Sequence, residues 1–264
     1  MEKSNCNNYH VFRIGLLTLH FNLQSKIMKQ VLKFILILLA LLLLVGVMVV
    51  LQSVDPKHKM PTVESHSFED TLANRSYNLD SLKTIIGDNK GLPPGFEVAA
   101  AIAYSAYPQL KDVIIDMILT PDGAPMESTV KIWSLFGPTK NRHYLILLND
   151  AEKSYFNPIL LRSLPFDAQV GILAHELGHI VYYNDLNIFE FGKWGLKYLQ
   201  DDEFRATHER STDMMPVYHG LGSQIYQYAY FVRNDPSCVA FYQEGKDFMD
   251  TYYLTDKELL EALK

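Results

Sequence analysis

The sequence predicts an α+β domain, because segments typical of β-strands come before segments typical of α-helices with little alternation between them. Three runs are rich in β-branched or aromatic residues: Val113–Leu119, Ser128–Phe136 and His143–Leu148. Helical spacing of apolar residues follows from about Phe166. This order disfavours a doubly wound sheet, in which strands and helices alternate.

The individual elements can be assigned in chain order. Leu79–Ile86 and the alanine-rich Pro93–Tyr107 are expected to be helices. T-P-D-G-A-P, a turn signal, separates the first two strands, and the three strands are expected to pair partly antiparallel. Phe166–Asn184 has the spacing of a long helix, with Asp167 placed to favour its N-terminus. Further helices are expected at Phe204–Tyr218, at Ile225–Val232 and after the capping box Thr255-x-x-Glu258.

Composition argues against several classes of function. The chain has 264 residues, 48% of them hydrophobic and 20% charged, which is ordinary for a globular protein. A net charge of -6 provides no basic surface for phosphates, so we expect no nucleic-acid partner. Cys6 and Cys238 lie on opposite sides of a long apolar run, so we expect neither a disulfide nor a cysteine-based zinc site.

That apolar run, Phe34–Leu51, predicts a membrane segment. It holds 18 residues without a charge, and at about 1.5 Å per residue it spans roughly 27 Å, close to a bilayer's hydrocarbon core. Lysines at positions 26, 29 and 33 precede it, which favours a cytoplasmic N-terminus and an extracytoplasmic domain. A cleaved signal peptide and a secreted domain are the alternative, but Leu51 and Ser53 stand where a cleavage site favours small residues.

Four regions follow from this interpretation. Residues 1–30 are a polar segment, and Met28 opens a short basic head before the apolar run, so we infer that translation starts at Met28. Residues 31–52 are the anchor or signal. Residues 53–67 mix proline, charge and hydroxyls as a linker does, and residues 68–264 are the domain.

The run A-H-E-L-G-H-I, Ala174–Ile180, carries the strongest chemical signal. His175 and His179 are four apart, so on a helix their rings share a face and can bind one metal ion. Glu176 points partly toward the same opening, where it can take a proton from a metal-bound water and pass it to a leaving amine. A single histidine is more often an ordinary core or surface residue, but three such residues at this spacing indicate a metal site.

A third ligand is needed. The layout H-E-x-x-H-x-x-G-x-x-H does not apply, since Tyr182 and Asp185 take the places of its glycine and last histidine; Asp185 stays open as a lesser alternative. Glu209 and Asp213 are four apart, so Glu209 can bind the metal while Asp213 accepts a hydrogen bond from a ligating histidine. A solvated acidic face is the plain alternative for this pair. Glu203 fits the acidic first turn of the same helix.

H-E-L-G-H followed by E-R-S-T-D, from Glu209 to Asp213, resembles the gluzincin zinc metallopeptidases. The sequence is most similar to their membrane-associated branch, related to the heat-shock and CAAX-prenyl proteases. The second motif there usually reads E-x-x-A-D, and Thr212 replaces its alanine here. The likeness covers about Arg142–Gly222, and this sequence has one apolar run instead of the several membrane spans of those proteases.

The resemblance implies a zincin-like catalytic domain, with a small sheet packed on the active-site helix. It also implies an edge strand that binds extended peptide; Arg142–Asn149 is in the matching place, and an ordinary core strand is the alternative. A residue that stabilises the developing oxyanion should exist. His219 is our first choice, with Tyr218 and Tyr226 as other candidates, whereas His208 should point away from the metal.

The expected function is therefore that of a zinc-dependent endopeptidase acting on a protein or peptide substrate. His175, His179 and Glu209 would bind Zn²⁺, and Glu176 would be the general base. The alternative is a non-catalytic, zinc-stabilised surface module that binds a protein or peptide partner. Glu176 favours the enzyme, because a binding module needs no general base. Neither substrate specificity nor oligomeric state follows from this one sequence.

Overall fold

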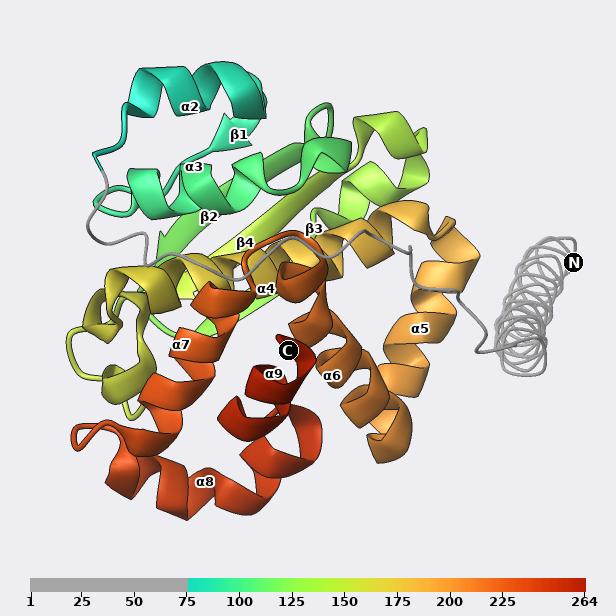
Figure 1. Cartoon of the computed structure of the whole chain (residues 1–264). Coiled ribbons are helices and arrows are strands. Elements are labelled where there is room, and N and C mark those ends of the chain that lie inside the picture. Colours follow the sequence, from blue (N-terminus) through green and yellow to red (C-terminus); the bar gives the residue numbers. More distant parts are fainter. Residues whose placement is uncertain (1–75) are drawn as a thin grey trace, which may run out of the picture. The chain divides into compact units, whose positions relative to one another are not determined.

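The structure, a computed structural model, describes residues 76–264, which belong to one compact unit (Figure 1). The predicted start at Met28, the apolar run Phe34–Leu51 and the linker Ser53–Ser67 lie outside the described residues. Within residues 76–264, no helix has both the length and the apolarity that crossing a bilayer requires.

The domain is α+β, as expected, with a small mixed sheet in the order β1-β2-β4-β3. The strands are β1 (Lys90–Gly91), β2 (Ile114–Thr120), β3 (Met126–Val130) and β4 (His143–Asn149). β2 runs parallel to β1 and β4, whereas β3 runs antiparallel to β4. The prediction of a partly antiparallel sheet is confirmed.

The position of β4 decides between the two alternatives for Arg142–Asn149, an edge strand and a core strand. β4 lies inside the sheet, with β2 on one side and β3 on the other, so it is a core strand and its edges are not free. β2 and β3 are separated by a turn but do not pair, because β4 lies between them. β3 is therefore the edge strand on this side of the sheet.

The predicted strand Ser128–Phe136 was too long. β3 ends at Val130, and residues Ile132–Phe136 form a 3-10 turn. The turn is closed by the Ser134 hydroxyl, which donates to the Lys131 carbonyl at 2.7 Å and accepts the His143 N–H at 3.1 Å. A side chain that bonds nearby backbone in this way competes with a strand's ladder.

The helices account for most of the described residues. Their bounds are α2 Leu79–Ile86, α3 Glu97–Ser105, α4 Phe166–Asp185, α5 Ile188–Gln200, α6 Asp202–Tyr218, α7 Gly222–Asn234, α8 Val239–Tyr252 and α9 Asp256–Ala262. The capping box expected at Thr255 and Glu258 is present at the start of α9. The sequence reasoning did not predict α5 and α8. α5 starts with its own capping box, formed by Asn187 and Glu190.

α4 is the central element of the core. In Figure 1 the sheet, α2 and α3 lie on one side of α4, and α6 to α9 lie on the other. Most of its residues are buried, including the motif from His175 to His179. The buried Tyr107 hydroxyl donates to the Ala174 carbonyl at 2.7 Å and so ties α4 to the segment after α3. The motif therefore lies on a helix that is packed from both sides.

α4 and α7 approach so closely that their contact tolerates only glycine at residue 171. A Cβ on Gly171 would lie 2.2 Å from the Gln224 carbonyl oxygen and 2.5 Å from the Ile225 nitrogen. Both neighbours are backbone atoms, which cannot move away without shifting α7.

We expect Gly171→Ala to lower the free energy of unfolding by about 2–3 kcal/mol, because the added methyl group overpacks a helix–helix contact. Denaturant unfolding followed by circular dichroism measures this. The matched control is Gly192→Ala in α5, where a Cβ meets nothing within 4 Å; it should be neutral or stabilising by up to about 1 kcal/mol, as expected for removing a helical glycine. Equal effects in the two variants would contradict the close packing.

Candidate metal centre

Three of the predicted residues form a buried group close enough to hold a metal ion. His175 and His179 come from α4, and Glu209 comes from α6. The exposed fractions of the three residues are 2%, 6% and 3%. The two Nε2 atoms lie 3.1 Å apart, and Oε2 of Glu209 lies 3.4 Å from each.

These separations fit one ion bound by all three atoms. Two ligands bound at 2.0–2.1 Å to a tetrahedral ion lie about 3.3–3.4 Å apart. The observed triangle has a circumradius of about 1.9 Å, so a point about 2.0–2.1 Å from all three atoms lies just outside its plane. Within the described part of the chain, no fourth side chain belongs to the group.

Asp213 has the position predicted for the partner of a ligating histidine. Its Oδ1 lies 2.8 Å from Nδ1 of His175, which leaves Nε2 of that ring directed at the metal position. Its Oδ2 accepts the backbone N–H of Leu254 at 2.7 Å. Hydrogen bonding of this kind fixes the orientation and tautomer of a metal-binding ring. The link also attaches the segment between α8 and α9 to the ligand.

Two further partners of the ligands were missed from the sequence. Nε2 of His208 lies 3.1 Å from Nδ1 of His179, so His208 supports that ring as Asp213 supports His175. Burial lowers the pKa of His208 to about 3, so this ring is neutral and can accept the Nδ1–H of His179. The Tyr198 hydroxyl donates to Oε1 of Glu209 and leaves Oε2 for the metal. His208 does not ligate, but it contacts the site.

The charged forms of His175 and Glu209 are stabilised by neighbouring side chains of opposite charge. Burial alone would lower the pKa of His175, but hydrogen bonds to Asp213 and Glu209 hold that pKa well above its ordinary value. Burial would raise the pKa of Glu209, but His179 and His175 hold it well below its ordinary value. A buried charge without such partners would be costly.

The approach of α6 to α4 depends on the glycine of the motif. A Cβ on Gly178 would lie 3.0 Å from Met215 Cβ and 3.1 Å from Thr212 Cγ2, both on α6. Thr212 replaces the alanine of the related motif, and its hydroxyl donates to the His208 carbonyl at 2.9 Å. Its polar group is therefore satisfied inside α6, and its methyl group packs on the glycine.

Glu176 follows His175 in the chain, and both residues line a cavity. The Ser128 hydroxyl, on the edge strand β3, lies 2.7 Å from Oε2 of Glu176 and 2.9 Å from its carbonyl oxygen. The adjoining cavity has a volume of about 290 Å³, and its lining includes His175, Glu176 and Asp213. The rest of its wall is mainly apolar or aromatic, from α7, α8 and the segment before α4.

Two tyrosines on the cavity wall were also not identified from the sequence. Tyr228 on α7 and Tyr253 after α8 line the cavity. Burial is the main cause that raises the pKa of both phenols. The negative charge of Asp213 raises the pKa of Tyr228 further, and that of Glu209 raises the pKa of Tyr253, so both phenols stay protonated. Each can therefore donate a hydrogen bond to a negatively charged group in the cavity.

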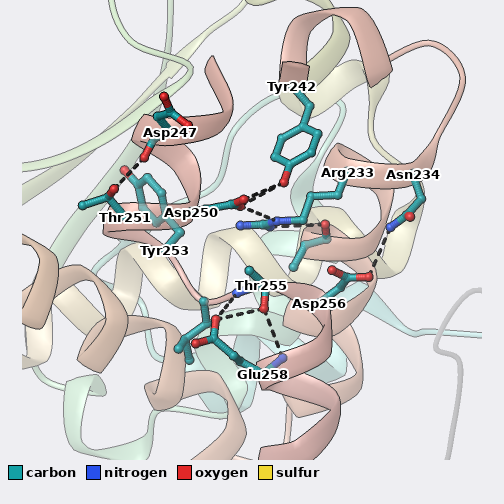
Figure 2. A network of polar contacts seen from close by, with 12 residues as sticks. Arg233, Asn234, Tyr242, Asp247, Asp250, Thr251, Tyr253, Thr255, Asp256 and Glu258 are labelled. Carbon is teal, nitrogen blue, oxygen red and sulfur yellow. Dashed lines mark hydrogen bonds and ion pairs between the residues drawn. The ribbon is translucent and has the colours of Figure 1, made fainter. Parts of the chain in front are cut away.

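Polar contacts hold the C-terminal helices that enclose the cavity, as Figure 2 shows. Arg233 of α7 donates to Asp250 of α8 at 3.2 Å, and the Tyr242 hydroxyl bonds the same carboxylate. At the α8–α9 junction, Arg210 of α6 bonds both the Tyr253 carbonyl and the side chain of Glu258. The part of the cavity wall formed by α8 and Tyr253 is thus attached to α6 and α7.

The remaining candidates lie elsewhere. His219 follows Glu209 by ten residues, about 15 Å along the helix axis, and its ring stacks on Tyr107 with centroids 4.2 Å apart. Its Nε2 lies 3.1 Å from Nε2 of Gln109. The structure thus does not bring His219 to the ligands. Asp185 and the exposed Glu203 are likewise not in the metal-binding group.

Removing a residue that hydrogen-bonds a metal ligand typically weakens metal binding by roughly 10–100-fold. Glu209→Ala removes a proposed ligand itself, so we expect a larger loss of zinc affinity. Zinc titration of the purified full chain with a competing chelator measures this. Glu203→Ala removes an exposed carboxylate from the same helix and should keep the affinity of the wild type. Full zinc retention by Glu209→Ala would exclude Glu209 as a ligand.

Comparisons of the chain with protein-family models, curated proteins and solved structures gave no match.

Proposed function

We propose that this protein is a zinc-dependent endopeptidase of the gluzincin type. The observation that carries the proposal is the buried triangle of His175, His179 and Glu209, with Glu176 next to His175 in the chain and lining the same cavity. Two imidazoles and one carboxylate suit zinc, and catalytic zinc sites combine three protein ligands with one open position. When bound, zinc lowers the pKa of a water ligand to about 7 and polarises a peptide carbonyl.

The protein groups would move the proton and hold the geometry. Glu176 accepts the proton of the attacking water and delivers it to the leaving amine. The hydrogen bond from Ser128 orients this carboxylate. Asp213 and His208 hold the rings of His175 and His179 in fixed orientations. The attacking water would therefore keep a constant position relative to Glu176.

A polypeptide substrate suits the surroundings of Glu176. β3 has an unpaired edge, and an extended peptide can add to such an edge through main-chain hydrogen bonds. Ser128 belongs to β3, so a peptide on that edge would pass near Glu176. The apolar cavity offers space for one of its side chains. In place of His219, we propose Tyr228 or Tyr253 as the donor that stabilises the developing oxyanion.

The alternative is a zinc-stabilised module that binds a partner without catalysis. Its support is the deep burial of the three ligands. Structural zinc sites are almost always closed by four protein ligands, whereas this group has three among the described residues. An open position and a neighbouring carboxylate favour the enzyme. We further propose that the apolar run Phe34–Leu51 anchors the domain outside the cytoplasm, with a secreted form as the alternative.

Glu176→Gln should lower kcat by about 10²–10⁴-fold, because the amide cannot accept the proton. It should retain zinc, since Glu176 is not in the metal-binding group. Cleavage of an unstructured protein by the full chain, with and without chelator, gives the first value, and zinc content gives the second. A zinc-loaded wild type that cleaves nothing would favour the binding module. Equal activity of wild type and variant would exclude Glu176 as the base.

Gly245→Leu should narrow the cavity. Gly245 lines it from α8, and a Cβ there meets nothing within 4 Å. We expect kcat/KM to fall about tenfold or more for peptides with a bulky apolar residue beside the cleaved bond, and less for alanine peptides. Gly195→Leu in α5 is the control, because Gly195 is equally unobstructed but lies outside the cavity wall. The same loss for both peptide types would show that the cavity does not select side chains.

A further inference from the structure

The turn between β3 and β4 exposes an unusual amount of apolar surface. Within five residues, Ile132 is 64% exposed, Trp133 83% and Phe136 72%. Scattered exposed apolar residues are normal, but several large ones together mark a surface that contacts something else. None of the three belongs to the wall of the cavity beside Glu176.

The turn is held firmly, so these side chains are displayed on an ordered support. The Lys131 N–H donates to the His143 carbonyl at 2.8 Å, and the Ser134 hydroxyl bonds both Lys131 and His143. Leu135, between the exposed residues, packs against the core. A turn with such anchors presents its apolar side chains without paying the entropy of ordering a loose loop.

The charged residues of the chain segment that carries the turn are basic. Lys131 and Lys140 are exposed on either side of the apolar residues, and no aspartate or glutamate occurs from Ser128 to Asn149. Tryptophan flanked by lysine is typical of the bilayer interface, where the indole lies at headgroup level and the amines can contact headgroup phosphates. The charge of the turn is thus complementary to the phosphate groups of lipid headgroups.

The start of α5 carries a further exposed aromatic residue, and the exposed acidic residues Asp185 and Glu190 flank it. Arg142, just after the turn, donates to the carbonyl oxygens of Tyr183 and Leu186 at the α4–α5 junction. Phe189, the second residue of α5, is 71% exposed. The turn and the start of α5 are therefore linked, and each carries an exposed aromatic residue.

We propose that the turn Ile132–Phe136 inserts into the interfacial layer of a lipid bilayer and is a second membrane contact of this chain. The sequence carries an apolar run that ends at Leu51, only 25 residues before the first described residue, Ser76. A chain of that length reaches at most about 90 Å, at roughly 3.3–3.6 Å per residue. A bilayer that holds the run is thus within reach of the domain.

This contact goes beyond the proposed peptidase activity, because it concerns where the domain lies and does not depend on zinc. A second copy of the chain or a protein partner would also cover apolar residues. The bilayer is favoured because the lysines flank a projecting turn of large apolar side chains, and this is the pattern of an interfacial anchor. One consequence is that polypeptides at the membrane surface would be the nearest substrates.

The two tryptophans of the chain allow a direct test. Trp133 is in the turn and Trp194 is in α5, packed beside Tyr183 and His208. Wild type and Trp133→Phe, both as the full chain, are reconstituted into phosphatidylcholine–phosphatidylglycerol vesicles with brominated acyl chains. The difference between the two emission spectra reports on Trp133, because Trp194 is present in both proteins. Because Trp133 is 83% exposed, its replacement removes no core contact; circular dichroism and zinc content check this.

Brominated lipid should quench about half of the wild-type emission, the share of one of two indoles, and much less of the emission of Trp133→Phe. Aqueous iodide should have little effect on the Trp133 signal. Ile132→Ser combined with Phe136→Ser should reduce the lipid quenching while leaving the fold unchanged. Quenching of Trp133 by iodide and not by lipid would overturn the proposal. Protection of Trp133 from both quenchers would also overturn it and would indicate a protein partner or a second copy.

Discussion

The close approach of α4 and α6 at Gly178 is the contact on which the candidate site depends. α4 supplies His175 and His179, and α6 supplies Glu209, so the three donor atoms meet only if the two axes are close. Any side chain at residue 178 would press on Thr212 and Met215 at 3.0–3.1 Å. A shift of a few tenths of an ångström would already be large beside the tolerance of a metal site.

The partners of Glu176 and of the candidate ligands come from more of the chain than these residues themselves do. Ser128 of β3 orients the Glu176 carboxylate, Tyr198 of α5 holds Glu209, and the backbone of Leu254, after α8, holds Asp213. Each bond satisfies a buried polar group that would otherwise be costly. The C-terminal helices therefore do two things: they enclose the cavity, and they fix a residue that orients a ligand. The cavity wall is thus connected through Asp213 to the residues that could hold a metal ion.

Local patterns predicted the type of most elements. The helix from Phe166 and the capping box at Thr255 follow from spacing and from side chains within a few residues. α5 was missed because glycines at 192 and 195 interrupt its pattern and lower its intrinsic helix propensity. The strand order was not predictable in the same way. Insertion of β4 between β2 and β3 is a choice among long-range pairings, and no local signal in the T-P-D-G-A-P turn encodes it.

By itself, the sequence determined which residues share a helix face: His175 with His179, and Glu209 with Asp213, since a spacing of four fixes relative direction on any helix. The structure brings these two faces together. Only the tertiary structure decided that His208 supports His179 and that His219 lies beside Tyr107, away from the ligands. The physical reason is that spacing gives direction within one helix, whereas distance between helices depends on packing, here on the absence of a side chain at Gly178.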